Sequence, residues 1–321
     1  MKKNKIAGVV ILFAIANSIY ADEPLQCDGT VQKPCTVQDT QNNTAQVKHW
    51  RNTFLIARKY QGNTAGLDTL WMSGSAEASA QGWKTIAENI KDVTHKKAKK
   101  IIDVDLRQES HGYLDQNAVN LTSENDWINR GKTRDESLSA EQNWLQFLSQ
   151  QKNVPNVLTP EQFKEEAFRQ GQDISVESVE NEETVVKKAG LQYFRLTVTD
   201  HMAPDDAGVD RFVALVKTIK PKSTWLHIHC RGGDGRTTTF MAMYDMLHNA
   251  DKVSLDDIIK RQAAVVPNYD LFDTTRGHPE LSEYYKQREQ FLRKFYVYAQ
   301  ASLKDYKGSW SQWLEQNKEV K

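Results

Sequence analysis

The segment HCRGGDGRTT at residues 229–238 contains the residue types needed to hold a phosphate group and attack it. Cys230 and Arg236 are separated by five residues, three of which are glycine: Gly232, Gly233 and Gly235. Glycines allow a tight backbone turn in which successive N–H groups point at one anion. Such donors favour a cysteine thiolate, and an arginine offers a planar fork to two phosphate oxygens. The spacing therefore predicts a phosphate-binding loop (P-loop) with a cysteine nucleophile and an arginine clamp.

Three other residues of this loop carry a reactive or charged group. Thr237 places a hydroxyl where it can donate to the sulfur of Cys230 and help the sulfur to leave. Arg231 adds positive charge at the rim, whereas Asp234 adds a negative charge whose role the sequence does not reveal. The preceding TWLHIHC reads as a strand, and a helix begins near Arg236. The positive N-terminal end of that helix then faces the same anion.

Two other interpretations of the loop stay open at this point. In the first, the glycines form a plain tight connection and Cys230 is an inert buried thiol. In the second, the loop binds a nucleotide, although neither G-x-G-x-x-G nor G-x-x-x-x-G-K-[ST] occurs there. The strand before the loop and the helix after it favour the phosphate cradle, because a motif in its structural context is more specific than a bare match.

A cysteine phosphatase also needs an acid that protonates the leaving oxygen. The segment TDHMAPDD offers three candidates: Asp200, Asp205 and Asp206. Asp200 follows a predicted strand, LQYFRLTV, so its side chain is expected at the carboxyl edge of the sheet, where such sites lie. Asp205 and Asp206 follow Pro204 and resemble first-turn helix residues. We therefore predict that Asp200 is the acid.

The segment IIDVDLRQESHG, upstream of both motifs, predicts a strand that ends in a polar turn around His111. Glu109 is placed to brace Arg236 from behind, because a buried arginine without a partner is costly. Arg107 is an alternative contact for a substrate phosphate. Asp103 and Asp105 either take part in the site or lie on a solvent-exposed face of the strand, and the sequence supports the two interpretations equally. Zinc-ligand spacing is not found, and the chemistry requires neither a metal nor a cofactor.

The elements around these motifs predict an α/β fold. Strands at IIDVDL, LQYFRLTV and TWLHIHC alternate with helices, which indicates a mostly parallel central sheet flanked by helices. Helices are expected over residues 76–98, 137–151, 207–219, 255–264 and 280–302. Residues 152–180 lack a clear period and predict a small inserted subdomain. Residues 22–50 are polar and predict an extended, loosely held N-terminal arm.

Length and charge limit the class of protein. A chain of 321 residues holds one large domain or two of ordinary size. Its 42 basic and 42 acidic residues give a net charge of zero, so no broad basic field is present to bind nucleic acid. A charged fraction of 26% argues against a membrane-embedded body.

The N-terminus has the layout of a secretory signal peptide. Three lysines precede an apolar run at residues 6–16, and small residues follow up to Ala21, which predicts cleavage after residues 1–21. The run is short for a bilayer-spanning helix, so no stable membrane anchor is expected after cleavage. In an exported protein the spacing of Cys27 and Cys35 suits a local disulfide, with two idle thiols as the alternative. The predicted location is periplasmic or extracellular.

Taken together, HCRGGDGRTT, the TDH about thirty residues upstream and DLRQESHG resemble the protein-tyrosine-phosphatase-like inositol polyphosphatases, the cysteine phytases. The phosphate loop is common to all cysteine phosphatases, whereas DLRQESHG and TDH are more specific to this group. The likeness runs from about Trp50 to the SWSQWL segment near the C-terminus. It implies a cysteine-phosphatase fold with the phosphatase domain over residues 51–321.

By this resemblance Cys230 is the nucleophile, Asp200 the general acid and Arg236 the phosphate clamp. His229 is a structural partner of the loop, while His201 and Arg51 contact substrate phosphates. The loop between nucleophile and clamp also binds phosphate through Arg231, Gly232, Gly233, Asp234 and Gly235. Several relatives carry an acid or a small residue where Arg231 stands here. The negative charge of Asp234 in the same loop leaves the preferred phosphate position on the ring undecided.

The resemblance implies hydrolysis of myo-inositol hexakisphosphate and lower inositol polyphosphates through a phosphocysteine intermediate. The substrate is strongly anionic, so the pocket is expected to be basic, with Arg51, Arg231, His201, Arg58 and Arg276 as candidates. One alternative is a tyrosine, dual-specificity or phosphoinositide phosphatase. Another is a catalytically silent module that binds phosphorylated ligands. A sulfurtransferase would not need Thr237 or Asp200.

Overall fold

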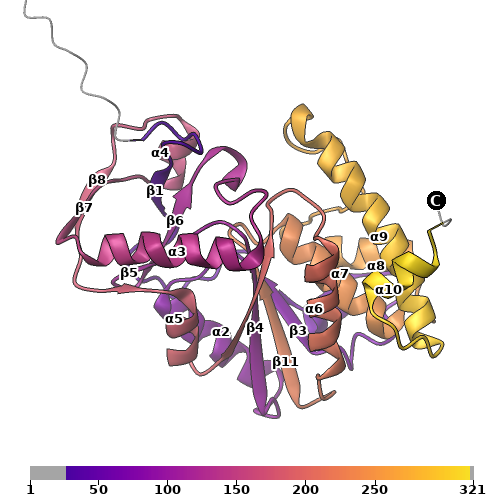
Figure 1. The fold of residues 1–321 in the computed structure, drawn as a ribbon. Coiled ribbons are helices and arrows are strands. Elements are labelled where there is room, and N and C mark those ends of the chain that lie inside the picture. Colours follow the sequence, from indigo (N-terminus) through magenta and orange to yellow (C-terminus); the bar gives the residue numbers. More distant parts are fainter. Residues whose placement is uncertain (1–26, 319–321) are drawn as a thin grey trace, which may run out of the picture.

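The computed structural model describes residues 27–318, and its centre is a five-stranded sheet in the order β10-β4-β11-β3-β2 (Figure 1). Neighbours among the first four strands are parallel, and β2 is antiparallel to β3. The strands are β2 (Arg51–Asn52), β3 (Met72–Ser75), β4 (Lys100–Arg107), β10 (Gln192–Val198) and β11 (Thr224–His229). The three strands predicted from the sequence are thus confirmed, and the carboxyl ends of β4, β10 and β11 meet at one edge.

Helices cover both faces of this sheet, as expected for an α/β fold (Figure 1). One face carries α6 (Asp206–Lys217), α7 (Gly235–Asn249), α8 (Leu255–Ala263), α9 (Ser282–Leu303) and α10 (Trp310–Gln316). Against the other face pack α2 (Ala80–Val93) and α5 (Glu182–Lys188). The remaining short helices are α1 (Thr53–Lys59), η1 (Glu124–Asp126) and η2 (Pro279–Leu281). Each face has its own apolar core, one around Phe240 and Phe295 and one around Trp83 and Trp225.

The central strands are buried on both faces, which corrects one expectation. Asp103 and Asp105 of β4 are fully buried, so the solvated strand face considered for them is wrong. His111 is also buried, and it lies in a strand, not in a turn. The sequence pattern suggested a half-exposed strand because polar residues alternate with apolar ones. Here Asp103 and Asp105 instead lie in a buried cluster of charged side chains, where they contact histidines and an arginine.

A smaller unit lies beside the central sheet (Figure 1). It contains a four-stranded antiparallel sheet in the order β1-β6-β5-β9 and a separate β7-β8 pair. Its strands are β1 (Cys35–Gln38), β5 (His111–Leu114), β6 (Asn117–Thr122), β7 (Asn153–Val157), β8 (Gln172–Ser175) and β9 (Val179–Glu180). Its helices are α3 (Arg134–Ser149) and α4 (Pro160–Lys164).

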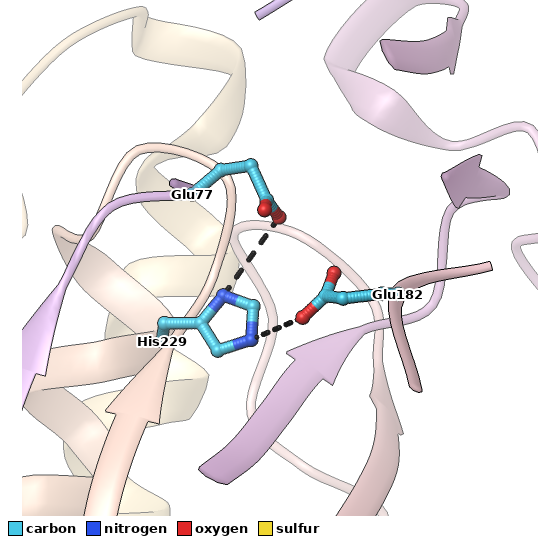
Figure 2. A group of neighbouring side chains, drawn as sticks. All are labelled: Glu77, Glu182 and His229. Carbon is cyan, nitrogen blue, oxygen red and sulfur yellow. Dashed lines mark ion pairs between the residues drawn. The ribbon is translucent and has the colours of Figure 1, made fainter. Parts of the chain in front are cut away.

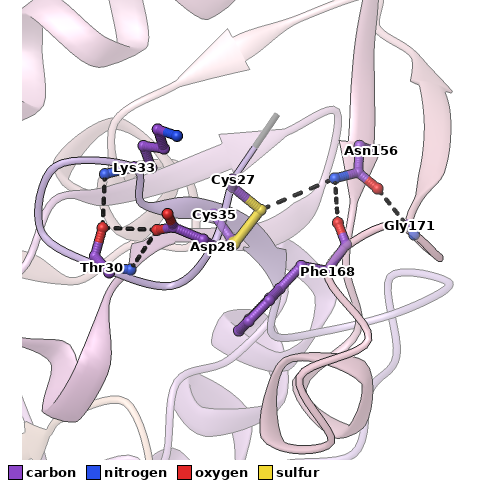
Figure 3. The surroundings of a disulfide bond; sticks show 8 residues. All are labelled: Cys27, Asp28, Thr30, Lys33, Cys35, Asn156, Phe168 and Gly171. Atoms are coloured by element: carbon purple, nitrogen blue, oxygen red, sulfur yellow. Dashed lines mark hydrogen bonds between the residues drawn. A yellow bond between two sulfur atoms is a disulfide. The ribbon is translucent and has the colours of Figure 1, made fainter. Parts of the chain in front are cut away.

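Residues 27–50 of the predicted N-terminal arm are part of this unit and not loosely held, which corrects the expectation for the described part of the arm. β1 pairs along its whole length with β6, and Cys35 and Val37 are fully buried. A disulfide joins Cys27 to Cys35 (Figure 3). Asn156 anchors this region, because its Nδ2 donates to the carbonyl of Phe168 at 2.8 Å and lies 3.9 Å from the Cys27 sulfur. The arm is therefore fixed to the segment that was predicted to be an insertion.

The signal peptide predicted at residues 1–21 lies outside the described residues. Among residues 27–318, no helix combines the length and the apolar character that crossing a membrane requires.

Candidate active site

The predicted phosphate-binding loop connects the end of β11 at His229 to the start of α7 at Gly235. Gly233 has a φ of +77°, a conformation that side chains rarely adopt. A Cβ at this position would come within 2.4 Å of the Ala76 backbone nitrogen. Glycine is therefore required at position 233, both for the turn and for the close approach to the chain after β3.

Cys230 lies at the start of this loop and is 97% buried. Thr237 Oγ1 donates a hydrogen bond to the Cys230 sulfur at 3.1 Å, which is the contact expected from the sequence. The first turn of α7 lies directly beyond the loop, so the partial positive charge of the helix N-terminus lies on the side of the sulfur. The sulfur of Cys230 is thus held between the Thr237 hydroxyl and the first turn of α7.

Arg236 is buried and fixed by Glu109, the residue expected to brace it. Its Nη1 and Nη2 donate to the two carboxylate oxygens of Glu109 at 2.6 and 2.8 Å. Burial by itself raises the pKa of Glu109, but the guanidiniums of Arg236 and Arg107 outweigh it and hold the pKa well below the usual range. Glu109 is thus an anion at all physiological pH values, and it orients the fork of Arg236.

Asp200 stands at the edge of the same pocket, with a side chain that is 23% exposed. Its Oδ1 lies 3.0 Å from Arg236 Nε and accepts the backbone N–H of His201 at 2.9 Å. The Asp200 carbonyl accepts a hydrogen bond from Trp127 Nε1 at 3.1 Å, which steadies the backbone. A carboxyl group beside the phosphate clamp and open to solvent is suitably placed for proton transfer.

The two other candidate acids have structural contacts elsewhere. Asp205 caps α6, because its Oδ1 accepts the N–H of Gly208 at 2.7 Å. Asp206 Oδ1 accepts a hydrogen bond from the indole of Trp310 at 2.7 Å. Neither lines the pocket that contains Cys230.

The pocket above the loop has a volume of about 310 Å³. From the residues predicted to form the site, its wall contains Cys230, Gly232, Asp234, Gly235, Arg236, Asp200 and His201. His201 adopts a φ of +66°, and its Nδ1 lies 3.2 Å from the hydroxyl of Tyr285. Burial lowers the pKa of His201, so the ring is mostly neutral near pH 7. A larger hollow of about 820 Å³ lies between α3 and β10, but none of these residues lines it.

Four residues from the C-terminal third complete the wall: Tyr269, Arg276, Tyr285 and Arg288. Arg288 Nη2 donates to the Tyr269 hydroxyl at 2.7 Å, and the Arg276 guanidinium lies 4.3 Å from the centre of the Tyr269 ring. Among residues 27–318, neither arginine forms an ion pair with a carboxylate. Arg276 is one of the basic candidates from the sequence, whereas Tyr269, Tyr285 and Arg288 were not predicted. Tyr285 and Arg288 are three residues apart on a predicted helix, so the sequence predicts that they share a helix face. It does not predict that this face lies against the pocket.

Arg231 does not lie at the rim, which corrects its predicted role. Its side chain is only 17% exposed, and it is held between Asp39 Oδ1 at 2.8 Å and Asp126 Oδ1 at 2.6 Å. Both partners belong to the smaller unit of the fold. The charge of Arg231 is therefore neutralised by carboxylates and fastens the phosphate loop to that unit. Arg58, another basic candidate, is exposed on α1 and does not line the pocket.

Arg51 is likewise buried behind the loop and does not form part of the pocket wall. Its Nη1 donates to the carbonyl of His49 and its Nη2 to Thr238 Oγ1, both at 3.0 Å. Burial lowers the pKa of Arg51 to about 10, while the nearby Cys230 and Asp234 oppose this shift. Its contacts support the loop from behind and do not reach a substrate directly.

His229 lies in a buried group of carboxylates (Figure 2). Its Nε2 is 2.8 Å from Glu182 Oε1 and 3.4 Å from Asp103 Oδ2, and its Nδ1 is 3.9 Å from Glu77 Oε2. Although burial lowers the pKa of His229, the carboxylates of Asp103 and Glu182 outweigh it and raise the pKa well above the usual value. The ring is therefore an imidazolium that ties the phosphate loop to α5 and β4.

Two overlapping groups have ligand atoms close enough together to hold a metal ion: Glu77, Glu182 and His229, and Asp105, His111 and Glu182. Arginines already contact both groups. Arg107 Nη1 contacts Glu77 Oε2, and Arg195 Nη1 lies 3.0 Å from Asp105 Oδ2. Because guanidiniums neutralise these carboxylates, we interpret the cluster as an ion-pair network.

Comparison with known proteins agrees with this geometry. The family model PTPlike_phytase, described as "Inositol hexakisphosphate", matches residues 104–248. The PTP-like phytase from Bdellovibrio bacteriovorus is similar, with 32% identity, a TM-score of 0.70, and coverage of 88% of this chain and 94% of that one. The PTP-like myo-inositol phosphatase from Mitsuokella multacida, solved in complex with myo-inositol-(1,3,4,5)-tetrakisphosphate, is 34% identical, with a TM-score of 0.75. That match covers 88% of this chain and 49% of the Mitsuokella chain.

Among curated proteins, effector protein hopD2 from Pseudomonas syringae pv. tomato is 30% identical over 210 residues. The match covers 65% of this chain and 45% of hopD2. The chain thus spans about half the length of hopD2 and of the Mitsuokella protein. The Bdellovibrio phytase, in contrast, is matched over nearly its whole length. On this evidence of sequence, fold and loop geometry, the chain belongs to the protein-tyrosine-phosphatase-like phytase family.

Proposed function

We propose that this protein is a cysteine-dependent phosphatase that hydrolyses myo-inositol hexakisphosphate and lower inositol polyphosphates. The observation that carries the proposal is the pocket wall, in which the Cys230–Arg236 loop stands beside Arg276 and Arg288. Neither of these two arginines has a carboxylate partner among residues 27–318, so both are available to further phosphates. The tetrakisphosphate bound to the Mitsuokella relative supports the same substrate class.

In the first step, the Cys230 thiolate attacks phosphorus in line with the ester oxygen. The S–P bond forms, the P–O bond breaks, and Asp200 gives its proton to the departing inositol oxygen. The loop amides and Arg236 hold the equatorial phosphate oxygens throughout, with Glu109 keeping the fork in place. The products of this step are the phosphocysteine, the inositol with one phosphate fewer, and an ionised Asp200.

In the second step, Asp200 takes a proton from a water molecule whose oxygen attacks the phosphocysteine. The S–P bond breaks, inorganic phosphate leaves, and the thiolate returns. Thr237 donates to the sulfur at 3.1 Å and so stabilises the departing thiolate. Asp200 is then protonated again and ready for the next substrate.

The test is phosphate release by the purified protein from three substrates in parallel: inositol hexakisphosphate, a phosphotyrosine peptide and a phosphoinositide in vesicles. We expect the highest kcat/KM on the inositol polyphosphate, and no release from any substrate by a Cys230→Ser control. Faster turnover of the phosphotyrosine peptide or of the lipid would replace this proposal by the corresponding phosphatase activity. Release by the control would contradict the covalent mechanism.

We also propose that the protein is exported, with residues 1–21 as a cleaved signal peptide and Cys27–Cys35 as a disulfide formed after export. Disulfides persist in oxidising compartments, which supports this location. N-terminal sequencing of the protein recovered from the periplasm or medium should begin at Asp22. A protein that retains its first 21 residues in the cytoplasm would refute export.

A further inference from the structure

We propose that Asp234 sets the substrate preference of this pocket: it disfavours a second phosphate beside the one held in the loop, and accepts a hydrogen bond from a free ring hydroxyl there. The enzyme is then biased toward inositol phosphates that already carry unphosphorylated hydroxyls, relative to the hexakisphosphate. This inference rests on the proposed function and assigns a role to a residue that the reaction steps do not use.

The position of Asp234 places a carboxylate in the wall of an anion-binding pocket. Asp234 lies in the loop between Cys230 and Arg236 and lines the same cavity as both. Its side chain is 43% exposed, so it faces solvent where a substrate would enter. Asp200, the other carboxylate of the wall, is needed for proton transfer, whereas Asp234 has no part in either step.

Asp234 also lacks the structural role that its position suggests. It occupies the N-cap position of α7, where an aspartate usually accepts a hydrogen bond from a backbone N–H of the first turn. Its side chain makes no such bond. Helix capping therefore does not explain an acid at this position.

The orientation of the carboxylate leaves one oxygen for a ligand. Oδ1 is buried and lies 2.8 Å from His49 Nδ1, which donates to the carbonyl of Gly232 at 2.8 Å. Because the side chain is 43% exposed while Oδ1 is buried, the solvent-facing oxygen is Oδ2. His49 thus lies against the buried side of the carboxylate, where Oδ1 accepts no hydrogen bond from the described part of the chain, and Oδ2 is the oxygen that a ligand can reach.

A phosphate and a ring hydroxyl beside Asp234 differ in charge and in hydrogen bonding, and this difference determines which of them binds there more favourably. An ionised carboxylate only accepts hydrogen bonds, and a phosphate at neutral pH is also an acceptor, so the two repel each other. A ring hydroxyl can donate to Oδ2, and hydrogen bonds to a charged acceptor are strong. A phosphate that remains next to the loop therefore costs binding free energy, whereas a hydroxyl at the same place gains it.

The test compares kcat/KM for inositol hexakisphosphate, myo-inositol-(1,3,4,5)-tetrakisphosphate and p-nitrophenyl phosphate in the full-length protein and in Asp234→Asn. The asparagine keeps the size of the side chain, removes its charge and adds a donor. The readout is the ratio of the hexakisphosphate value to the tetrakisphosphate value, in which any general effect on the loop cancels. We expect the variant to raise this ratio by about 5-fold or more, the factor that corresponds to two like unit charges about 4 Å apart in water.

The matched control is Glu280→Gln, which removes the same charge from an exposed residue outside the pocket. It should leave the ratio within about twofold of the unmodified protein. Two outcomes in Asp234→Asn would overturn the inference while leaving the proposed function intact. These are an unchanged ratio and an equal fall in kcat/KM for all three substrates. If the unmodified protein hydrolyses p-nitrophenyl phosphate but neither inositol phosphate, the proposed function fails, and this inference fails with it.

Discussion

Glu109 and Arg236, which are 127 residues apart in the chain, face each other through two hydrogen bonds of 2.6 and 2.8 Å. Both side chains are almost completely buried, so neither can be solvated if the other is removed. The guanidinium is thereby fixed before substrate binds, and its Nε edge remains directed toward Asp200 at 3.0 Å. Preorganisation of this kind means that little ordering of the clamp is needed during the reaction.

Removing the charge of Glu109 is expected to damage both stability and catalysis. Glu109→Gln leaves the Arg236 charge buried without its partner, which should lower the free energy of unfolding by about 3–5 kcal/mol. The pKa of Glu109 is held well below its usual range, so its contribution is present at neutral pH and lost as pH falls through the folded-state pKa. Urea denaturation of both proteins at pH 7 measures the loss of stability, and the same measurement down to pH 3 should show this loss shrinking below the ordinary glutamate pKa of about 4.3.

The control for this experiment is Glu289→Gln, which breaks the exposed ion pair with Arg293 on α9. Exposed pairs contribute little, so this variant should remain close to the unmodified protein. Equal stability of the two variants would show that the Glu109–Arg236 contact does not stabilise the fold.

Cys230→Ser should abolish turnover and retain ligand binding. A serine hydroxyl is barely ionised at neutral pH, and no neighbouring base in the proposed mechanism activates it. Phosphate release and isothermal titration with inositol hexakisphosphate measure the two properties separately. Appreciable turnover by this variant would rule out Cys230 as the nucleophile.

Asp200→Asn should lower kcat by roughly 10²–10⁴-fold on inositol phosphates. The loss should be much smaller on p-nitrophenyl phosphate, whose leaving group needs little protonation. Asp205→Asn is the control, because this residue caps α6 and its loss should affect stability and not the leaving-group dependence. If Asp205→Asn shows the kinetic pattern and Asp200→Asn does not, the assignment of the acid is wrong.

Substitution of Arg276 in the pocket wall and of Arg231 in the loop should have different effects. Arg276→Gln is expected to raise KM for inositol hexakisphosphate far more than KM for p-nitrophenyl phosphate, and added salt should reduce the difference. Arg231→Gln should instead lower the melting temperature, because its partners Asp39 and Asp126 lose their shared cation. Steady-state kinetics at two salt concentrations, together with thermal unfolding, separate the two outcomes. If Arg231→Gln raises KM for inositol hexakisphosphate selectively, Arg231 contacts the substrate after all.

The preference attributed to Asp234 should depend on pH. Burial raises the pKa of Asp234, against the opposing effect of His49, Arg51 and Arg276 and with a smaller contribution from Asp200. The carboxylate is charged above its pKa, so discrimination against the hexakisphosphate should be strongest near neutrality and weaken as pH falls. Asp234→Asn, measured over the same range, accounts for protonation of the substrate itself. A parallel pH dependence in both proteins would contradict this role for Asp234.

The residue types of the loop and much of its structural setting could be predicted from the sequence. The spacing of Cys230, Arg236 and Thr237 follows from local backbone geometry, because a strand, a glycine turn and a helix are adjacent in the chain. Asp200 and Glu109 could also be predicted, since the carboxyl ends of parallel strands meet at one edge of a sheet. The contacts between Glu109 and Arg236 and between Thr237 and Cys230 are those expected.

The charges that line the pocket could not be predicted in the same way, because they depend on contacts between distant segments. Arg231 follows Cys230 in sequence, yet its partner Asp39 is 192 residues away, in an arm whose polar composition suggested that it was loose. Arg288 reaches the pocket because α9 packs on α7, and no local pattern encodes that packing. Tyr269 comes to the same wall from the segment between α8 and α9. A buried charge takes whichever partner the fold brings to it, since an unpaired charge in the interior is too costly to persist. For this reason the type of chemistry can be predicted from neighbouring residues, whereas the charge distribution of the pocket depends on how distant segments pack.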